Sequence, residues 1–154
     1  AGADFLVMPC NSLHAFIKEI RESVKIPVLS ILEETTKFLK QKEISSVGLI
    51  STVITKRHRL YENAFKLAGI KTALPNELEQ AKIGEIIHHL VINRQGNKER
   101  EQLLKIIEGF KNQNIHDVVL ACTDLQLLVP EHGDVKIHDT MKILADAVVK
   151  NILK

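Results

Sequence analysis

Runs of consecutive apolar residues alternate along this chain with segments in which apolar residues recur every three or four positions. The runs with the length of a buried strand cover residues 5–8, 28–31, 47–50 and 118–121. Apolar strands that alternate with helical patterns are typical of an α/β fold with a parallel sheet. We therefore expect parallel α/β architecture.

The helical segments carry an apolar stripe on one face. We expect helices within residues 51–68, 81–92, 99–110 and about 139–153. In the first of these segments, Leu60, Phe65 and Leu67 fall on one face. A further helical pattern begins at Leu13 and runs to Val24.

Each of the two cysteines follows a predicted strand. Cys10 comes after the run at 4–8 and opens the helical pattern that begins at Leu13, and Cys122 comes after the run at 117–121. In open α/β sheets, ligands bind outside the carboxyl ends of the strands, where helix N-termini present free backbone N–H groups. Both thiols are therefore expected to face one cleft.

A free cysteine is often a small buried hydrophobe, so packing is the alternative to catalysis. Polar side chains stand beside each thiol, however: Asn11 and Ser12 after Cys10, and Thr123 after Cys122. A purely apolar packing site has no need of them, so we favour a paired-thiol active site.

Other cysteine chemistries fit the sequence less well. Two cysteines in 154 residues favour a reducing compartment, so we expect a cytoplasmic protein without a disulfide. No second Cys or His stands at zinc-ligand spacing beside either thiol, and Cys10 with His14 is the nearest approach. We therefore expect no metal.

Composition narrows the range of partners. Hydrophobic residues make up 45% of the chain, enough for a core, whereas a single Tyr and no Trp leave few aromatic platforms for nucleic-acid bases. The basic cluster at 56–59 is interpreted as a solvated helix start, which could also draw an anionic substrate towards the cleft. No apolar run reaches membrane length. Neither nucleic acid nor a membrane is expected as a partner.

Three motifs together resemble the aspartate/glutamate racemase family, in particular its cofactor-independent aspartate racemase branch. They are Met-Pro-Cys-Asn-Ser-Leu-His-Ala-Phe at 8–16, Ala-Cys-Thr-Asp at 121–124 and His-Asp-Thr-Met at 138–141. The resemblance covers the whole chain. It implies two Rossmann-like parallel-sheet domains, the first of them incomplete here because an N-terminal portion is expected to be missing. Residues 1–30 and 138–154 would be the remnant of the first domain, and residues 31–137 the second.

The resemblance implies racemisation of a small acidic amino acid, aspartate before glutamate, with no cofactor. Cys10 and Cys122 would be the catalytic pair, one thiolate removing the α-proton while the other thiol protonates the opposite face. The implied substrate-binding residues are Asn11, Ser12, Thr52, Thr55, Thr123 and Asp124. A homodimer is also implied.

Two alternatives remain open: a related hydantoin racemase or maleate isomerase-like enzyme, and a catalytically silent racemase-like fragment for binding or oligomerisation. If the first reading holds, the two sulfurs lie too far apart for a disulfide, and Cys10 is the more exposed. The last helix should then present Leu144, Val148 and Ile152 to solvent or to another chain.

Overall fold

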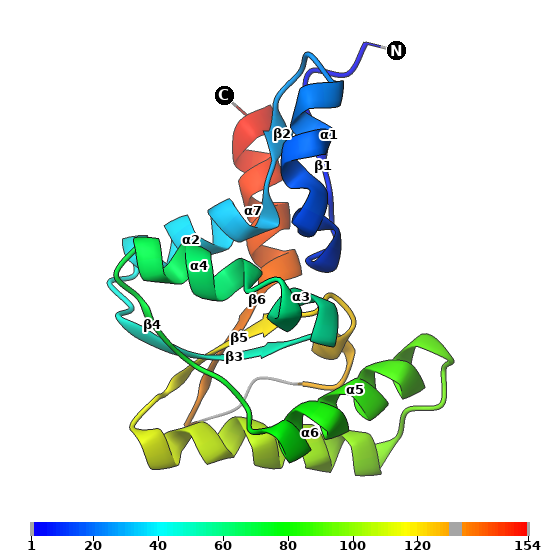
Figure 1. The fold of residues 1–154 in the computed structure, drawn as a ribbon, viewed down its shortest axis with the longest axis vertical. Helices are drawn as coiled ribbons and strands as arrows, with labels where there is room; N and C mark the ends of the chain where they lie inside the picture. Colours follow the sequence, from blue (N-terminus) through cyan, green and yellow to red (C-terminus); the bar gives the residue numbers. More distant parts are fainter. Residues whose placement is uncertain (1, 130–133, 154) are drawn as a thin grey trace.

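The structure is a computed structural model that describes residues 2–129 and 134–153. Its larger sheet is parallel, with the strand order β4-β3-β5-β6 (Figure 1). The bounds are β3 (Ser46–Ser51), β4 (Lys71–Ala73), β5 (Asp117–Ala121) and β6 (Lys136–Asp139). A separate parallel pair joins β1 (Leu6–Val7) to β2 (Val28–Leu29). Parallel α/β architecture is thus confirmed.

Helices cover both faces of the larger sheet (Figure 1). One face carries α2 (Ile31–Gln41), α4 (Leu60–Leu67) and the start of α7 (Thr140–Ile152), and the other carries α5 (Glu77–Val91) and α6 (Asn97–Gly109). Successive side chains of a strand point to opposite faces, so β3 places Leu49 in the core beneath α2 and Ile50 in the core above α5. This two-sided burial explains why β3 and β5 are apolar along their whole length.

The edge strands β4 and β6 were not predicted. Their sequences, Lys-Thr-Ala and Lys-Ile-His-Asp, lack an apolar run because an edge strand pairs on one side only and is less deeply buried. Periodicity therefore had little to detect in these two strands.

The prediction of one helix within residues 51–68 was wrong. The segment forms α3 (Val53–Arg57) and α4, and Arg59 between them has a left-handed backbone with φ of 50°. Leu67, expected on the apolar face, is 91% exposed. Tyr61 and Phe65 form the buried face of α4 instead.

The N-terminal segment continues from β1 through a 3₁₀ turn, η1 (Ser12–Phe16), into α1 (Ile17–Ser23). Together with β2 and the end of α7 it projects from the larger sheet, and both termini lie at that end (Figure 1). At the other end of α7, His138 and Asp139 still belong to β6 and pair with β5. The division into a first-domain remnant and a second domain stays a prediction.

The stripe of α7 differs from the expectation. Leu144 is 2% exposed and packs into the core that contains Ile31 and Leu39 of α2, so its predicted exposure was wrong. Val148 is half-buried, whereas Ile152 is 66% exposed. The first turns of α7 therefore pack against α2, and its last turns do not. Across the described part of the chain, every helix is too short or too polar to cross a membrane.

Candidate active site

The candidate site lies at the carboxyl edge of the larger sheet. Strands β3 and β5 are neighbours, with Ser51 opposite Ala121, so the next residues, Thr52 and Cys122, leave the sheet side by side. The loop from Cys10 to Ser12 reaches the same edge, because Ser12 Oγ lies 2.9 Å from Thr52 Oγ1. In parallel α/β folds this is the edge at which ligands bind.

Three hydroxyl groups meet there. Ser12 Oγ is 2.9 Å from Thr52 Oγ1 and 3.2 Å from Thr55 Oγ1, and Thr52 Oγ1 donates to Thr55 Oγ1 over 3.0 Å. Thr52 also caps α3 by accepting from the Thr55 N–H. Thr55 is fully buried, whereas Ser12 and Thr52 are half-buried. Thr55 therefore orients the other two hydroxyls, which keep access to the solvent side.

Asn11 connects the Cys10 loop to the core. Its Nδ2 donates to Thr140 Oγ1 over 3.2 Å, and its Oδ1 accepts from the Tyr61 hydroxyl over 2.5 Å. Thr140 Oγ1 donates in turn to the Leu120 carbonyl of β5, over 2.9 Å. Asn11 is 3% exposed, and both ends of its carboxamide are engaged by the protein. In this geometry Asn11 holds the loop in place; its predicted contact with substrate stays a prediction.

Cys122 is 6% exposed and packs among the apolar residues beneath the sheet. Burial is the main cause that raises the pKa of its thiol to about 11, and the charges of Asp124 and Cys10 raise it further. The backbone N–H groups of Asp124 and Leu125 act against this rise. The thiol donates to Asp124 Oδ2 over 3.9 Å. At neutral pH Cys122 is therefore a protonated thiol beside a carboxylate.

Cys10 is the more exposed of the two thiols, as predicted. Both cysteines are free. A substrate-sized gap between them stays a prediction. Thr123, between Cys122 and Asp124, is half-buried, and its carbonyl accepts from Gln126 Nε2 over 3.0 Å.

Four residues that support this site were not predicted as site residues: His14, Tyr61, Gln80 and Thr140. Gln80 on α5 donates to the Ser51 carbonyl over 3.0 Å, at the end of β3. His14 contacts the Cys10 carbonyl. The signal available in the sequence was weak, since each is a polar residue within an otherwise apolar helical face. Except for His14, these residues act through contacts with residues 20 to 129 positions away in the sequence.

Metal ligation finds no support in the geometry. Across residues 2–129 and 134–153, no three His, Cys, Asp or Glu side chains gather closely enough to hold a metal ion. What the site offers is two thiols, a carboxylate beside one of them, and hydroxyl groups.

The chain is similar to known amino-acid racemases. The Broad specificity amino-acid racemase RacX of Bacillus subtilis is 26% identical over 154 residues, covering 99% of this chain and 66% of RacX. The Picrophilus torridus aspartate racemase structure matches with a TM-score of 0.85 and 27% identity, over 97% of this chain and 62% of that one. A Yersinia pestis structure assigned as an Asp/Glu racemase matches with a TM-score of 0.90 and 25% identity, over 99% and 68%.

This chain thus spans about two-thirds of the length of each of these relatives. The sequence pattern of one family, described as Asp/Glu/Hydantoin racemase, matches residues 1–148. That match takes in both cysteines and the loops around them. The chain belongs to the Asp/Glu/Hydantoin racemase family.

Proposed function

We propose that the whole protein racemises an acidic amino acid, aspartate before glutamate, by a two-thiol mechanism that needs no cofactor. The observation that carries the proposal is the attachment of the Cys10 loop to the end of β5, through Asn11 and Thr140, next to Cys122. Two thiols from separate segments thereby share one sheet edge. The relatives add support, since one is named a broad specificity amino-acid racemase and another an aspartate racemase.

The chemistry requires a base and an acid on opposite sides of one carbon. In one direction the Cys10 thiolate takes the α-proton, and the electron pair stays on the α-carbon as a carbanion. Cys122 then gives its thiol proton to the other face and becomes the thiolate. For the opposite enantiomer the two roles are exchanged. General acid–base groups contribute about 10²- to 10⁴-fold each when they are well placed.

The raised pKa of Cys122 fits the donor role, because the thiol holds its proton until the carbanion forms. In the reverse direction Cys122 must first lose that proton. Asp124, whose Oδ2 accepts from the thiol, is the group placed to take it.

Substrate recognition is assigned to the polar groups beside the thiols. The hydroxyl of Ser12 is a donor for a carboxylate, and Thr52 and Thr55 hold it in place. Thr123 is a further hydroxyl donor, and Asp124 a partner for the substrate ammonium. Asn11 is directed into the core, where its hydrogen bonds to Thr140 and Tyr61 hold the Cys10 loop in place.

The test uses the chain expressed with whatever coding sequence precedes it. Proton exchange at the α-carbon and chiral product are measured in D₂O with L- and D-aspartate and with L- and D-glutamate. Cys10→Ser and Cys122→Ser are each expected to lower net racemisation by about 10²- to 10⁴-fold, because each removes one acid–base group. Each variant should keep more α-proton exchange from one enantiomer, and the two should prefer opposite enantiomers.

The exposed Ser45→Ala variant, at the opposite end of β3, serves as the matched control and should racemise normally. Normal racemisation by both cysteine variants would refute the two-thiol assignment, and so would a requirement for added pyridoxal phosphate. Ligand binding without any α-proton exchange would favour the silent-fragment alternative.

A further inference from the structure

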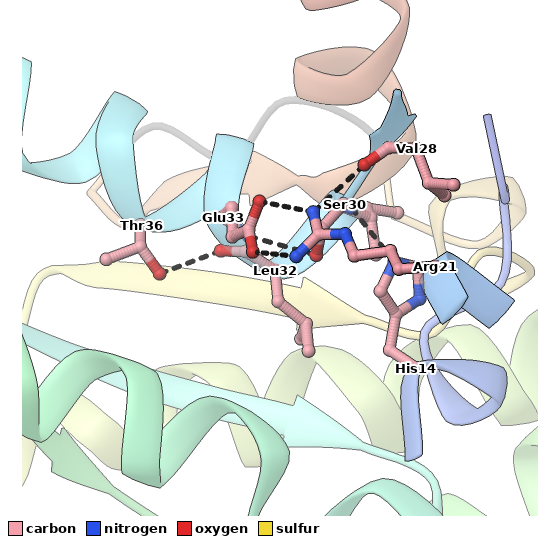
Figure 2. Close-up of polar contacts among 8 residues, drawn as sticks. His14, Arg21, Val28, Ser30, Leu32, Glu33 and Thr36 are labelled. Carbon is pink, nitrogen blue, oxygen red and sulfur yellow. Dashed lines mark hydrogen bonds and ion pairs between the residues drawn. The ribbon is translucent and has the colours of Figure 1, made fainter. Parts of the chain in front are cut away.

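His14 lies in η1, one turn beyond Cys10, and is 2% exposed. Its Nδ1 is 2.8 Å from the Cys10 carbonyl oxygen, and its Nε2 accepts from the Ile31 N–H over 3.2 Å. Figure 2 shows the ring directed at the start of α2. One side chain thus joins the backbone of the candidate catalytic cysteine to the first residue of another helix.

These two contacts define the protonation state of the imidazole. A carbonyl oxygen accepts, so Nδ1 must carry a hydrogen; a backbone N–H donates, so Nε2 must carry none. The ring is therefore neutral and protonated at Nδ1. An imidazolium would set the Nε2 hydrogen against the Ile31 N–H and place a positive charge at a helix N-terminus, where the helix dipole disfavours it.

The first turn of α2, to which His14 is hydrogen-bonded, is also held by other polar contacts. Arg21 of α1 donates to both carboxylate oxygens of Glu33 on α2, over 2.7 and 2.8 Å, and to the Val28 carbonyl of β2, over 2.9 Å (Figure 2). The Ser30 hydroxyl caps the same turn by accepting from the Glu33 N–H. The first turn of α2 is thus a fixed point for His14.

We propose that His14 is a positioning residue for Cys10, whose neutral imidazole fixes the Cys10 backbone to the first turn of α2. The inference rests on the proposed function in taking Cys10 as the reacting thiol. His14 does not touch the substrate in this scheme. It sets where the thiol stands, and a displacement of about 1 Å is enough to cost roughly 10²-fold in rate.

A pH dependence follows from the same contacts. The charged groups that face His14 are Arg21, which opposes its protonation, and Glu33, which favours it, and burial outweighs both and lowers the His14 pKa. Above the ordinary histidine pKa of about 6.5 the ring is neutral in the folded and the unfolded chain. As the pH falls below that value, the unfolded chain binds the proton first, so stability is lost and the Cys10 anchor opens on acidification.

The variants His14→Gln and His14→Ala separate positioning from simple packing. A glutamine carboxamide can donate to the Cys10 carbonyl and accept from Ile31, but it does not titrate. Alanine can do neither. His116→Ala, at an exposed position before β5, is the matched control.

We expect His14→Ala to lower kcat by about 10- to 100-fold with KM changed less than about threefold, and His14→Gln to stay within about threefold of the parent. In the chain alone, alkylation of Cys10 by iodoacetamide at pH 7.5 should rise about fivefold in His14→Ala and less than about twofold in His14→Gln, because the loop opens locally. Imidazole ¹⁵N NMR should show the Nδ1–H tautomer. His116→Ala should change none of these.

An Nε2–H tautomer, or equal alkylation rates in the parent and both His14 variants, would overturn the proposal. If the parent does not racemise any amino acid, the proposed function fails, while the NMR and alkylation results still decide the role of His14. If His14→Ala does not fold, the role of His14 is decided by two other measurements. One is the imidazole tautomer. The other is the opening of the Cys10 loop on acidification, measured by Cys10 alkylation, which His14→Gln should abolish.

Discussion

Cys122 should be an unusually slow thiol towards alkylating reagents. Iodoacetamide reacts with thiolates, and burial raises the pKa of the Cys122 thiol to about 11. The reagent therefore reports directly on the environment that suits Cys122 to donate a proton. The unmutated chain can be used, because mass spectrometry distinguishes the peptide that carries Cys10 from the one that carries Cys122.

The magnitude follows from the two ionisation states. At pH 8 a thiol with a pKa of about 8.5 is roughly one-quarter thiolate, whereas a pKa of about 11 leaves about one thiolate in a thousand. The smaller thiolate fraction lowers the alkylation rate roughly 200-fold. The more basic thiolate is intrinsically more nucleophilic, however, and this raises the rate about tenfold. Alkylation should therefore be about 20-fold slower than that of an unperturbed cysteine in a model peptide, before the 6% exposure of Cys122 slows it further.

The assay follows the modified fraction of Cys122 with time between pH 7 and pH 10. Because its pKa lies above this range, the rate should rise about tenfold for each pH unit and reach no plateau. Asp124→Asn removes a negative charge that raises the Cys122 pKa, so it should speed the reaction. Asp146→Asn, on the exposed face of α7, is the matched control and should leave the rate unchanged.

A plateau below pH 9, or a rate equal to that of an unperturbed cysteine in a model peptide, would refute the assignment of Cys122 as a buried protonated thiol. Slower alkylation in Asp124→Asn than in the parent would show that the carboxylate acts on the thiol in a different way.

Two stability predictions follow from close contacts. A Cβ at Gly48 would lie 2.7 Å from the Phe110 ring, so Gly48→Ala should destabilise by about 1–3 kcal/mol in urea unfolding, while Gly84→Ala on α5, where nothing lies within 4 Å, should be neutral or stabilising. Equal stability of the two variants would show that the Phe110 ring moves freely. Tyr61→Phe leaves Asn11 Oδ1 without its donor and should cost about 1–3 kcal/mol in the same assay; no loss of stability would mean that water replaces the hydroxyl.

The layers of this fold could be predicted because its central strands are buried on both faces. The run at 47–50 corresponds to the interior of β3, and the run at 118–121 to that of β5. The missed break in the predicted helix at 51–68 lies at Arg59, whose positive φ carries no signal in the sequence. Local periodicity identifies what is buried, and it says little about where a helix is interrupted.

The candidate site was predictable in part for a related reason. A thiol followed by small polar residues at the end of an apolar strand is a local signal, and it made Cys10 and Cys122 candidates. The bond from Asn11 to Thr140 joins residues 129 positions apart, and only the fold brings them together. Asn11 was therefore assigned to the substrate, although its two polar ends have partners inside the protein.

The two thiols are held by different means, and this difference bears on how the site works. Cys122 is fixed by the main sheet itself, because it follows β5 directly and is buried beneath it. Cys10 follows a two-residue strand of the smaller sheet and depends on hydrogen bonds from its loop. Those bonds connect Asn11 to α7 and α4, Ser12 to α3, and His14 to α2. The position of Cys10 therefore depends on contacts with four separate helices, so a shift of any one helix against the sheet moves Cys10 and leaves Cys122 in place.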